Sequence, residues 1–447
     1  QATARGEAWV LHQAGGAPLA ILSGSPLTMQ HDPRRGQTLA LTPVQGQRVS
    51  LRCVMPPSQW PAPPTLVLHG NSPDHQTPAG EPVVIHWHAG GLAGEGWQLW
   101  GQVEDLNTCA LAHREQLPLV ARGGEAAGAW RLAWTQPGPW RMQLTLVSPA
   151  GVATAFHGVF VYDLPSYRPE LPRPANYERF WRSAVAELRS LPLEIAMNLR
   201  AAESSAEYQV FDVLITGWDG KRLQATYGEP TAHGRYPVSI GAGHRGANKE
   251  AVSRPQICTL KYSMDGQARF RSGWYSPYHA NLFHNIMDGL RWLDFLATRP
   301  RADLGRSILY AGSRGGPVSL GMLALDDRIT RHIANVPTNN AWLWQVTMPG
   351  SGGAWGPWPK DCPGRAERRH LGYFEPIHFA EQIRQPCLLG LGLLDGLSQV
   401  TGNLAVAARL GSLGHLCLRP WHGHDDASPA WYQLKQQWET EILGLTD

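Results

Sequence analysis

Hydrophobic and polar positions divide the chain into a β-rich first half and a second half in which strands and helices alternate. In the first half, short and partly alternating apolar runs are separated by Gly- and Pro-rich turns, at Trp97–Val103, Trp130–Trp134, Trp140–Val147 and Val159–Tyr162. Runs of this length and spacing are typical of packed antiparallel sheets. We therefore predict a small β module over residues 1–75 and an immunoglobulin-like β-sandwich over residues 76–163.

Residues 164–175 are predicted to form a stiff linker, because four prolines fall between Leu164 and Pro174. A larger domain over residues 176–447 follows, and it opens with an amphipathic helix for which Asn176 is a suitable N-cap. The apolar face of that helix consists of Tyr177, Phe180, Trp181, Ala184, Val185 and Leu188.

Beyond this helix, apolar strand-like runs alternate with helical segments. The expected strands are Tyr208–Ile215, Arg222–Tyr227, Tyr236–Ile240, Ile308–Tyr310, His332–Val336, Pro386–Gly392 and Leu416–Arg419. Helices are expected around Phe283–Leu296, over Pro317–Leu325 and at the C-terminus. Such alternation predicts a parallel sheet wrapped by helices.

The stretch Ser307–Pro317 has the pattern of a nucleophile elbow. An apolar run ends at Ala311, and Ser313 is followed by Arg314, two glycines and a helix-like segment. In such an elbow a strand turns sharply into a helix, and the serine stands at the tip in a strained backbone conformation. The positions two before and two after the serine must be small, as Ala311 and Gly315 are. The alternative is an ordinary Gly-rich turn between a strand and a helix.

Two further residues would complete a nucleophile, base and acid. A serine hydroxyl needs a histidine base, and that histidine needs a carboxylate that fixes its tautomer. Asp395 follows the strand that ends near Gly392, and His424 follows the last strand. The order serine, acid, histidine, each after a strand, is that of an α/β-hydrolase. We expect Ser313, His424 and Asp395 to be catalytic, with His422 as the rival base.

The oxyanion formed during acyl transfer needs two N–H donors. The amide of Arg314, the residue after the nucleophile, is one candidate, and the loop after the strand at 236–240 contains His244 and Arg245. The Arg314 side chain could add a charged donor or hold an acidic substrate. Alternatively, it forms a salt bridge to a neighbouring loop.

Composition narrows the classes of function. A net charge of +3 with only five lysines is no signature of nucleic-acid binding, and no run of about 18 apolar residues predicts a membrane span. The chain has 19 tryptophans. Tryptophan at this density often lines sugar-binding surfaces, although these side chains could equally serve packing. The six cysteines lack metal-ligand spacing, so structural zinc is not expected, nor is a cofactor. Cys53 and Cys109 could pair in an exported protein.

Three smaller expectations concern metal, location and assembly. His86 and His88 flank Trp87 on a predicted strand, but no third ligand accompanies them, so we expect exposed strand histidines rather than a metal site. The chain begins at Gln1, and we expect export to the periplasm or the extracellular space, with a cytoplasmic location as the alternative. The sequence leaves open whether the chain forms a homo-oligomer.

From about residue 174 to residue 444 the chain resembles the acetyl xylan esterase/cephalosporin C deacetylase family of carbohydrate esterases. The matching pieces, in order, are Pro174–Trp181, Trp218–Arg222, Asp288–Leu296, Gly312–Gly316, Ala324–Ile329, Gly372–Pro376, Gly392–Asp395 and Gly423–His424. The resemblance implies an α/β-hydrolase domain, whereas the N-terminal all-β, sandwich-like region has no counterpart in the simple members of the family. It also implies a Ser313/His424/Asp395 triad that removes acyl groups, usually acetate, from sugar hydroxyls. The second oxyanion amide would come from His244 or Arg245.

Three family signatures are altered around these residues. The Arg-Gly-Gln signature reads Asp265-Gly-Gln267, the Ser-Gln-Gly-Gly elbow reads Ser313-Arg-Gly-Gly316, and the final His-Glu reads His424-Asp425. A Ser-Arg elbow is also similar to that of glucuronoyl esterases, in which the arginine assists at the oxyanion. A long loop over residues 339–369 is expected to wall the site. The residues expected to contact substrate are Gln267 and, from this loop, Trp342, Trp344 and Trp355, with Trp358 nearby.

Three functions remain open from the sequence. The first is a serine esterase that removes acetyl or other small acyl groups from carbohydrate or a small ester. The second is a serine hydrolase of another ester, such as a uronate ester recognised by Arg314. The third is a catalytically weak protein whose β half and Trp-rich loop bind a glycan. Hydrolysis of a nitrophenyl ester would separate the first two from the third.

Overall fold

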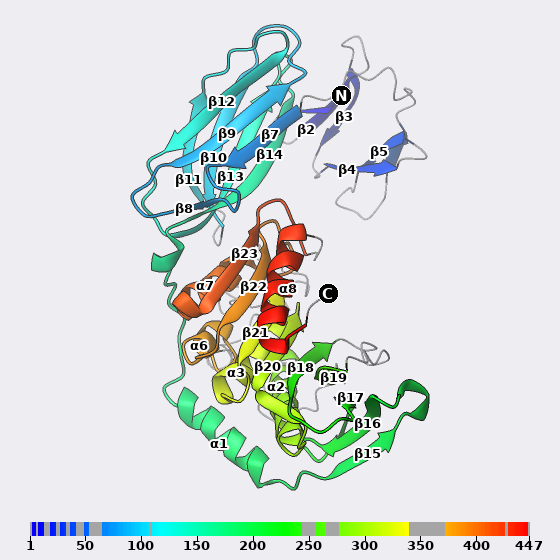
Figure 1. The fold of residues 1–447 in the computed structure, drawn as a ribbon. Coiled ribbons are helices and arrows are strands. Elements are labelled where there is room, and N and C mark those ends of the chain that lie inside the picture. The colour runs from blue at the N-terminus through cyan, green and yellow to red at the C-terminus, as the bar shows by residue number, and fades with distance from the viewer. Residues whose placement is uncertain are drawn as a thin grey trace.

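The computed structural model describes residues 65–106, 110–243, 255–264, 277–338, 372–424 and 428–445, and the backbone of six short strands before them. These strands are β1 (Ala2–Arg5), β2 (Ala8–His12), β3 (Pro18–Ser23), β4 (Leu27–Asp32), β5 (Gly36–Leu41) and β6 (Val49–Arg52). They pair in chain order as two antiparallel sheets of three strands each (Figure 1).

A β-sandwich follows. One sheet has the order β11-β10-β13-β14-β8 and the other the order β12-β9-β7. The strands are β7 (Thr65–Gly70), β8 (Gln76–Thr77), β9 (Val83–Gly90), β10 (Gln98–Asp105), β11 (Leu111–Leu117), β12 (Glu125–Leu132), β13 (Gly138–Val147) and β14 (Ala153–Tyr162). Their inward side chains, which include Trp87, Trp130 and Trp140, form one core. Because β7 pairs with β9, the sandwich includes Thr65–Gly70, which precede the boundary expected near residue 76.

The second half is built on one sheet of nine strands with the order β15-β16-β17-β19-β18-β20-β21-β22-β23. The strands are β15 (Ile195–Leu199), β16 (Tyr208–Thr216), β17 (Arg222–Pro230), β18 (Tyr236–Gly243), β19 (Cys258–Ser263), β20 (Ala302–Gly312), β21 (Arg331–Asn335), β22 (Cys387–Gly392) and β23 (Gly414–Arg419). Pairing is antiparallel from β15 to β19 and parallel from β19 to β23. The predicted parallel sheet is therefore present, with an antiparallel extension.

Helices cover both faces of this sheet. They are α1 (Tyr177–Ser190), α2 (Pro277–Ala297), α3 (Gly315–Leu325), α6 (Pro376–Ala380), α7 (Val400–Leu410) and α8 (Pro429–Leu443). Alternate residues of the strands point to opposite faces. Leu309 thus joins the larger core with α2, α3 and α7, whereas Ile308 packs with Trp431 and Trp438 of α8. Within the described residues, no helix is long and apolar enough to cross a membrane.

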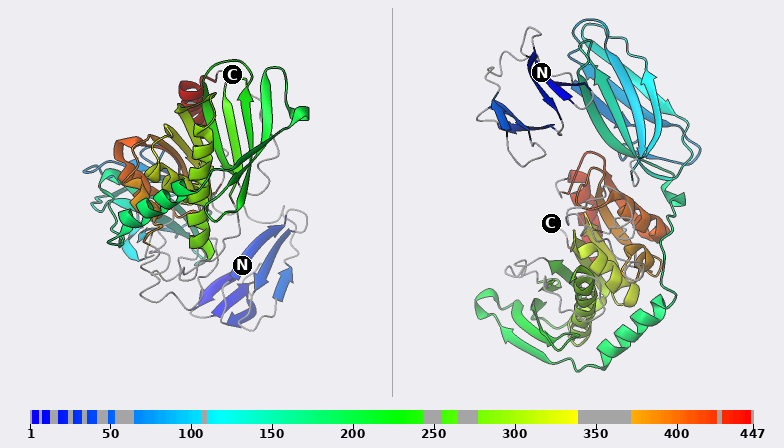
Figure 2. Two further views of the ribbon diagram at one scale, coloured as in Figure 1. Left: turned by 90° about the horizontal axis from the view of Figure 1, so that it is seen from below. Right: turned by 180° about the vertical axis from the view of Figure 1, so that it is seen from behind.

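The sandwich packs against the α/β domain through its larger sheet. Val159 and Val161 of β14 belong to the core of the α/β domain. The ring of His75 meets the ring of Trp421 edge to face at 5.0 Å. The connecting segment then runs past α7 and α6 to reach α1 (Figures 1 and 2), and Arg409 of α7 donates to the carbonyl of Pro169 at 2.8 Å. The Pro-rich linker is thus held along the domain surface.

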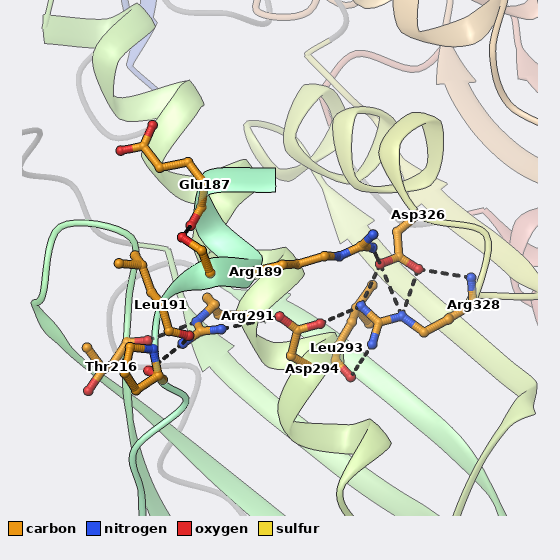
Figure 3. A network of polar contacts seen from close by, with 11 residues as sticks. Glu187, Arg189, Leu191, Thr216, Arg291, Leu293, Asp294, Asp326 and Arg328 are labelled. Atoms are coloured by element: carbon orange, nitrogen blue, oxygen red, sulfur yellow. Dashed lines mark hydrogen bonds and ion pairs between the residues drawn. The ribbon is translucent and has the colours of Figure 1, made fainter. Parts of the chain in front are cut away.

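A buried polar network ties α1, α2 and the segment after α3 together (Figure 3). The Arg291 side chain is 2 % exposed and donates to the backbone carbonyls of Leu191, Pro192 and Thr216. On the same side, Arg328 bridges the carboxylates of Asp294 and Asp326. The guanidinium of Arg291 therefore satisfies carbonyls where α1 and β16 end, which are strong acceptors that burial would otherwise leave unpaired.

Candidate active site

Four parallel strands end at the same edge of the sheet, and the predicted catalytic residues follow three of them. Ser313 comes directly after β20, Asp395 lies three residues after β22, and His424 lies five residues after β23. The turn after β21 lies between them, because β21 is hydrogen-bonded to both β20 and β22. Segments that are far apart in the sequence thereby converge at one point.

The backbone of Ser313 has the conformation that a nucleophile elbow requires. Its φ of 45° lies in the left-handed region, which a non-glycine residue adopts only under constraint. The Ser313 N–H donates to the carbonyl of Asn335 at 3.2 Å, and the Ser313 carbonyl accepts the N–H of Gly316 at 2.9 Å. A β-carbon added at Gly315 would lie 3.6 Å from that of Ala311, so the strand and the helix pass within van der Waals contact at these two positions.

Ser313, His424 and Asp395 form one chain of hydrogen bonds. The Ser313 Oγ lies 3.0 Å from the Nε2 of His424, and the His424 Nδ1 lies 2.9 Å from the Oδ2 of Asp395. The Asp395 side chain is 3 % exposed and that of His424 is 18 % exposed. The other oxygen of Asp395 accepts the N–H groups of Leu397 and Ser398, both at 2.8 Å. The carboxylate is thus fixed on both sides, and the imidazole bridges it to the hydroxyl.

His424 rather than His422 faces the hydroxyl of Ser313. His422 instead contributes its backbone carbonyl, which accepts the N–H of Leu394 at 3.0 Å. A β-carbon at Gly392 would lie 2.2 Å from the carbonyl oxygen of Gly423. The end of β22 therefore leaves room for the histidine loop only because position 392 has no side chain.

Two buried hydroxyl groups that the sequence interpretation missed also belong to this group. The Oγ of Ser398 lies 3.2 Å from the Nδ1 of His424 and 3.2 Å from the Oγ1 of Thr338, and the latter lies 3.4 Å from the Oγ of Ser313. The only local signal was the Asp-x-x-Ser spacing from Asp395, which is typical of a capping turn. Thr338 carried no signal at all.

Arg314 directly precedes α3 and therefore lies at the N-terminus of that helix, where backbone N–H groups favour negative charge. The other residues expected around the oxyanion and the substrate lie outside the described residues: His244, Arg245, Gln267, Trp342, Trp344, Trp355 and Trp358, as do Cys53 and Cys109. The described cysteines, Cys258, Cys387 and Cys417, are buried free thiols.

The two strand histidines of the sandwich have ordinary protein partners. The His86 ring stacks on that of His69 at 4.9 Å and lies 3.3 Å from the side-chain oxygen of Asn71, and His88 lies 3.7 Å from a carboxylate oxygen of Glu125. Within the part of the chain that the structure describes, no three metal-ligating side chains come together.

Comparison with known proteins shows which enzymes this chain is similar to. Residues 156–271 match the family model described as acetyl xylan esterase (AXE1). An acetyl esterase of Xylanibacter ruminicola, Axe7A, is 21 % identical over 272 residues, which are 54 % of this chain and 61 % of that protein. Over these parts of its length the chain is similar to acetyl xylan esterases. The predicted resemblance is confirmed, although the chain spans less than two thirds of the length of that curated relative.

Solved structures of acetyl xylan esterases share the fold of about two thirds of this chain. The enzyme from Paenibacillus sp. R4 superposes with a TM-score of 0.54 at 21 % identity, covering 63 % of this chain and 98 % of that one. The enzyme from Thermoanaerobacterium sp. JW/SL YS485 gives 0.52 at 19 % identity, with the same coverage. The expected fold, an α/β-hydrolase domain with an N-terminal antiparallel β region, is confirmed.

Proposed function

We propose that this chain is a serine esterase that removes acetyl or other small acyl groups from carbohydrate through a covalent acyl-enzyme. The observation that carries the proposal is the unbroken contact chain from the Ser313 Oγ through both nitrogens of His424 to Asp395, at an elbow with a φ of 45°. Homology to acetyl and acetyl xylan esterases supports the ester chemistry and the preference for acetate.

In the proposed mechanism the Ser313 Oγ attacks the ester carbonyl while its proton passes to the Nε2 of His424. Asp395 keeps the proton of the His424 Nδ1 directed toward itself and stabilises the positive imidazolium. The imidazolium then gives its new proton to the departing sugar oxygen, which leaves the acetyl group on Ser313. Water, deprotonated by His424, attacks the acyl-enzyme, and acetate departs as the Ser313 Oγ regains a proton from His424.

The developing oxyanion would be held by the backbone N–H of Arg314 at the start of α3 and by a second amide from the loop that contains His244 and Arg245. Each such donor is worth about a hundredfold or more in rate. The Trp-rich loop over residues 339–369 would supply apolar surface for the sugar.

Acetate release from acetylated xylo-oligosaccharides, with 4-nitrophenyl acetate in parallel, tests the proposal. Ser313→Ala should lower kcat by about a millionfold while leaving the melting temperature within a few degrees, because the three residues act as a unit. A variant that retains more than about a tenth of the activity would refute the nucleophile assignment. A wild-type chain that binds the oligosaccharides without cleaving either ester would favour the glycan-binding alternative.

A further inference from the structure

The turn after β21 is bound directly to the nucleophile. The N–H of Thr338 donates to the carbonyl of Ser313 at 2.8 Å, and the N–H of Ser313 donates to the carbonyl of Asn335 at 3.2 Å. Between these two bonds lies Val336, a β-branched residue whose φ of 41° is strained. Its N–H is held by the carbonyl of Gly390 at 2.8 Å. This turn is fixed to the elbow at both ends, which places the Thr338 side chain next to the Ser313 hydroxyl.

The side chains of Ser313, Thr338 and Ser398 and the imidazole of His424 form a closed ring of polar contacts. The Ser313 Oγ contacts the Nε2 at 3.0 Å, the Nδ1 contacts the Ser398 Oγ at 3.2 Å, and the two hydroxyl groups are joined through Thr338. Thr338 is 2 % exposed and Ser398 is 1 % exposed. Buried hydroxyl groups of this kind interact more strongly than exposed ones, and each has only one proton to donate.

Counting those protons leaves Thr338 as the donor to the nucleophile. The Ser313 proton is directed to the His424 Nε2, from where it is transferred during attack. The Ser398 hydroxyl lies 3.2 Å from the carbonyl of Val336, an acceptor with no proton of its own, so the Ser398 proton is directed there. Among the residues that the structure describes, the Thr338 proton then has two acceptors, the Oγ of Ser398 at 3.2 Å and the Oγ of Ser313 at 3.4 Å.

We propose that Thr338 is a further catalytic residue, whose hydroxyl donates a hydrogen bond to the Ser313 Oγ whenever that oxygen gains negative charge, and that Ser398 is a positioning residue for Thr338 and His424. No bond of Thr338 breaks: the Ser313 proton moves to His424 and back, while the Thr338 hydroxyl turns from Ser398 toward Ser313. The contact of 3.4 Å is long in the resting site, as catalytic hydrogen bonds often are before the substrate arrives. This inference rests on the proposed function only in taking Ser313 as the nucleophile.

Thr338→Val and Thr338→Ser provide the direct comparison, because valine keeps the shape without the hydroxyl and serine restores the hydroxyl. We expect kcat/KM for 4-nitrophenyl acetate to fall about ten- to a hundredfold in Thr338→Val and to return to within about threefold of wild type in Thr338→Ser. The matched control is Thr259→Val in β19, which removes another buried hydroxyl, one that contacts the Tyr208 hydroxyl at 3.0 Å. It should lower the melting temperature similarly without lowering kcat/KM. Equal kcat/KM in Thr338→Val and Thr259→Val, or no recovery in Thr338→Ser, would overturn the proposal.

Ser398→Ala tests the positioning role. It removes an acceptor from the His424 Nδ1, so the charged imidazole is less stabilised and the acid limb of the pH profile of kcat/KM should move to lower pH. The double variant with Thr338→Val should be slower than Thr338→Val alone by a smaller factor than Ser398→Ala costs in the wild type, since Ser398 is proposed to act partly through Thr338. Strict multiplication of the two losses, with an unmoved acid limb, would contradict the role.

A second readout separates this inference from the proposed function. The rate at which a fluorophosphonate reagent labels Ser313, followed by intact mass, depends on the nucleophile and not on the natural substrate. We expect labelling of Thr338→Val to be slower than that of wild type by the same ten- to hundredfold. If Thr338→Val is labelled more slowly as expected but the wild type does not deacetylate carbohydrate, the proposed function alone is refuted. Equal labelling of both chains would defeat the role of Thr338 alone. Should Thr338→Val not fold, Thr338→Ala against Thr338→Ser gives the same comparison.

Discussion

Arg314 stands between Ser313, the proposed nucleophile, and the body of α3, where the sequence pattern of acetyl xylan esterases has glutamine. Its guanidinium can hold a carboxylate by two parallel hydrogen bonds, which a glutamine amide cannot match. We expect Arg314→Gln to lower kcat/KM for a methyl uronate ester about tenfold or more, and to change kcat/KM for acetylated xylose by less than about threefold. If Arg314→Gln changed kcat/KM for both substrates by the same factor, only the backbone amide of Arg314 would serve catalysis.

The buried carboxyl of Asp288 in α2 is expected to make the free energy of unfolding depend on pH. Burial raises the pKa of Asp288 to about 7, against the opposing effect of the Lys221 ammonium. The folded state therefore binds this proton more tightly than the unfolded state, in which an aspartate titrates near pH 4. The stabilisation is fully present below about pH 4 and is lost as the pH rises to about 7.

Asp288→Asn should remove that dependence. The free energy of unfolding of the wild type relative to the variant, measured in urea, should fall between about pH 4 and pH 7 and then level off. Asp327→Asn, at an exposed position beside the buried network, is the matched control and should show a nearly constant difference. A difference for Asp288→Asn that stays constant or grows with pH would refute the assignment of a raised pKa.

Single residues differ in how far sequence could assign them. Ser313, Asp395 and His424 could be singled out because each follows a strand, in the chain order that is typical of an α/β-hydrolase. Thr338 could not, because its contact with Ser313 depends on the left-handed backbone of Val336, and valine gives no signal for that conformation. Ser398 reaches His424 only because the Asp395 turn folds it back.

At the scale of elements, the end of β22 sets the position of the histidine loop. A β-carbon at Gly392 would lie 2.2 Å from the carbonyl oxygen of Gly423, next to His424. We expect Gly392→Ala to displace this loop and to lower kcat/KM about a hundredfold or more, since an error of about 1 Å in catalytic geometry costs that much. Gly396→Ala is the control, because a β-carbon there meets nothing within 4 Å. If the two variants kept similar kcat/KM values, β22 would not position His424.

The strands that sequence reasoning found are those with apolar runs bounded by turns. Two escaped it. The side chains of β15 (Ile195–Leu199) are mostly exposed, so that edge strand lacks the alternation that marks a half-buried strand. The apolar run of β19 (Cys258–Ser263) is only a few residues long, and tertiary pairing with β17 and β18 fixes it as a strand. The parallel strands β20 to β23 were found because both faces are buried, which produces continuous apolar runs.

At the scale of the whole molecule, the β-sandwich adjoins the proposed catalytic loop. Trp421, three residues before His424, meets the buried ring of His75. Sequence could predict two separate domains but not this contact, because it joins residues distant in the chain. We expect Trp421→Ala to lower kcat/KM about tenfold. Tyr432→Ala, an exposed aromatic of α8, should leave kcat/KM unchanged. Equal activity of the two variants would mean that the sandwich does not support the loop.

We propose above that Ser313 is a nucleophile activated by His424 and Asp395. The sharpest test is labelling with a fluorophosphonate reagent, with the labelled residue located by peptide mass spectrometry. We expect one label per chain, on Ser313, with complete loss of 4-nitrophenyl acetate hydrolysis as labelling completes. We also expect His424→Ala to slow labelling about a thousandfold or more while the chain stays folded. An unlabelled Ser313 in the folded wild-type chain, or a labelling rate that His424→Ala leaves unchanged, would refute the nucleophile assignment.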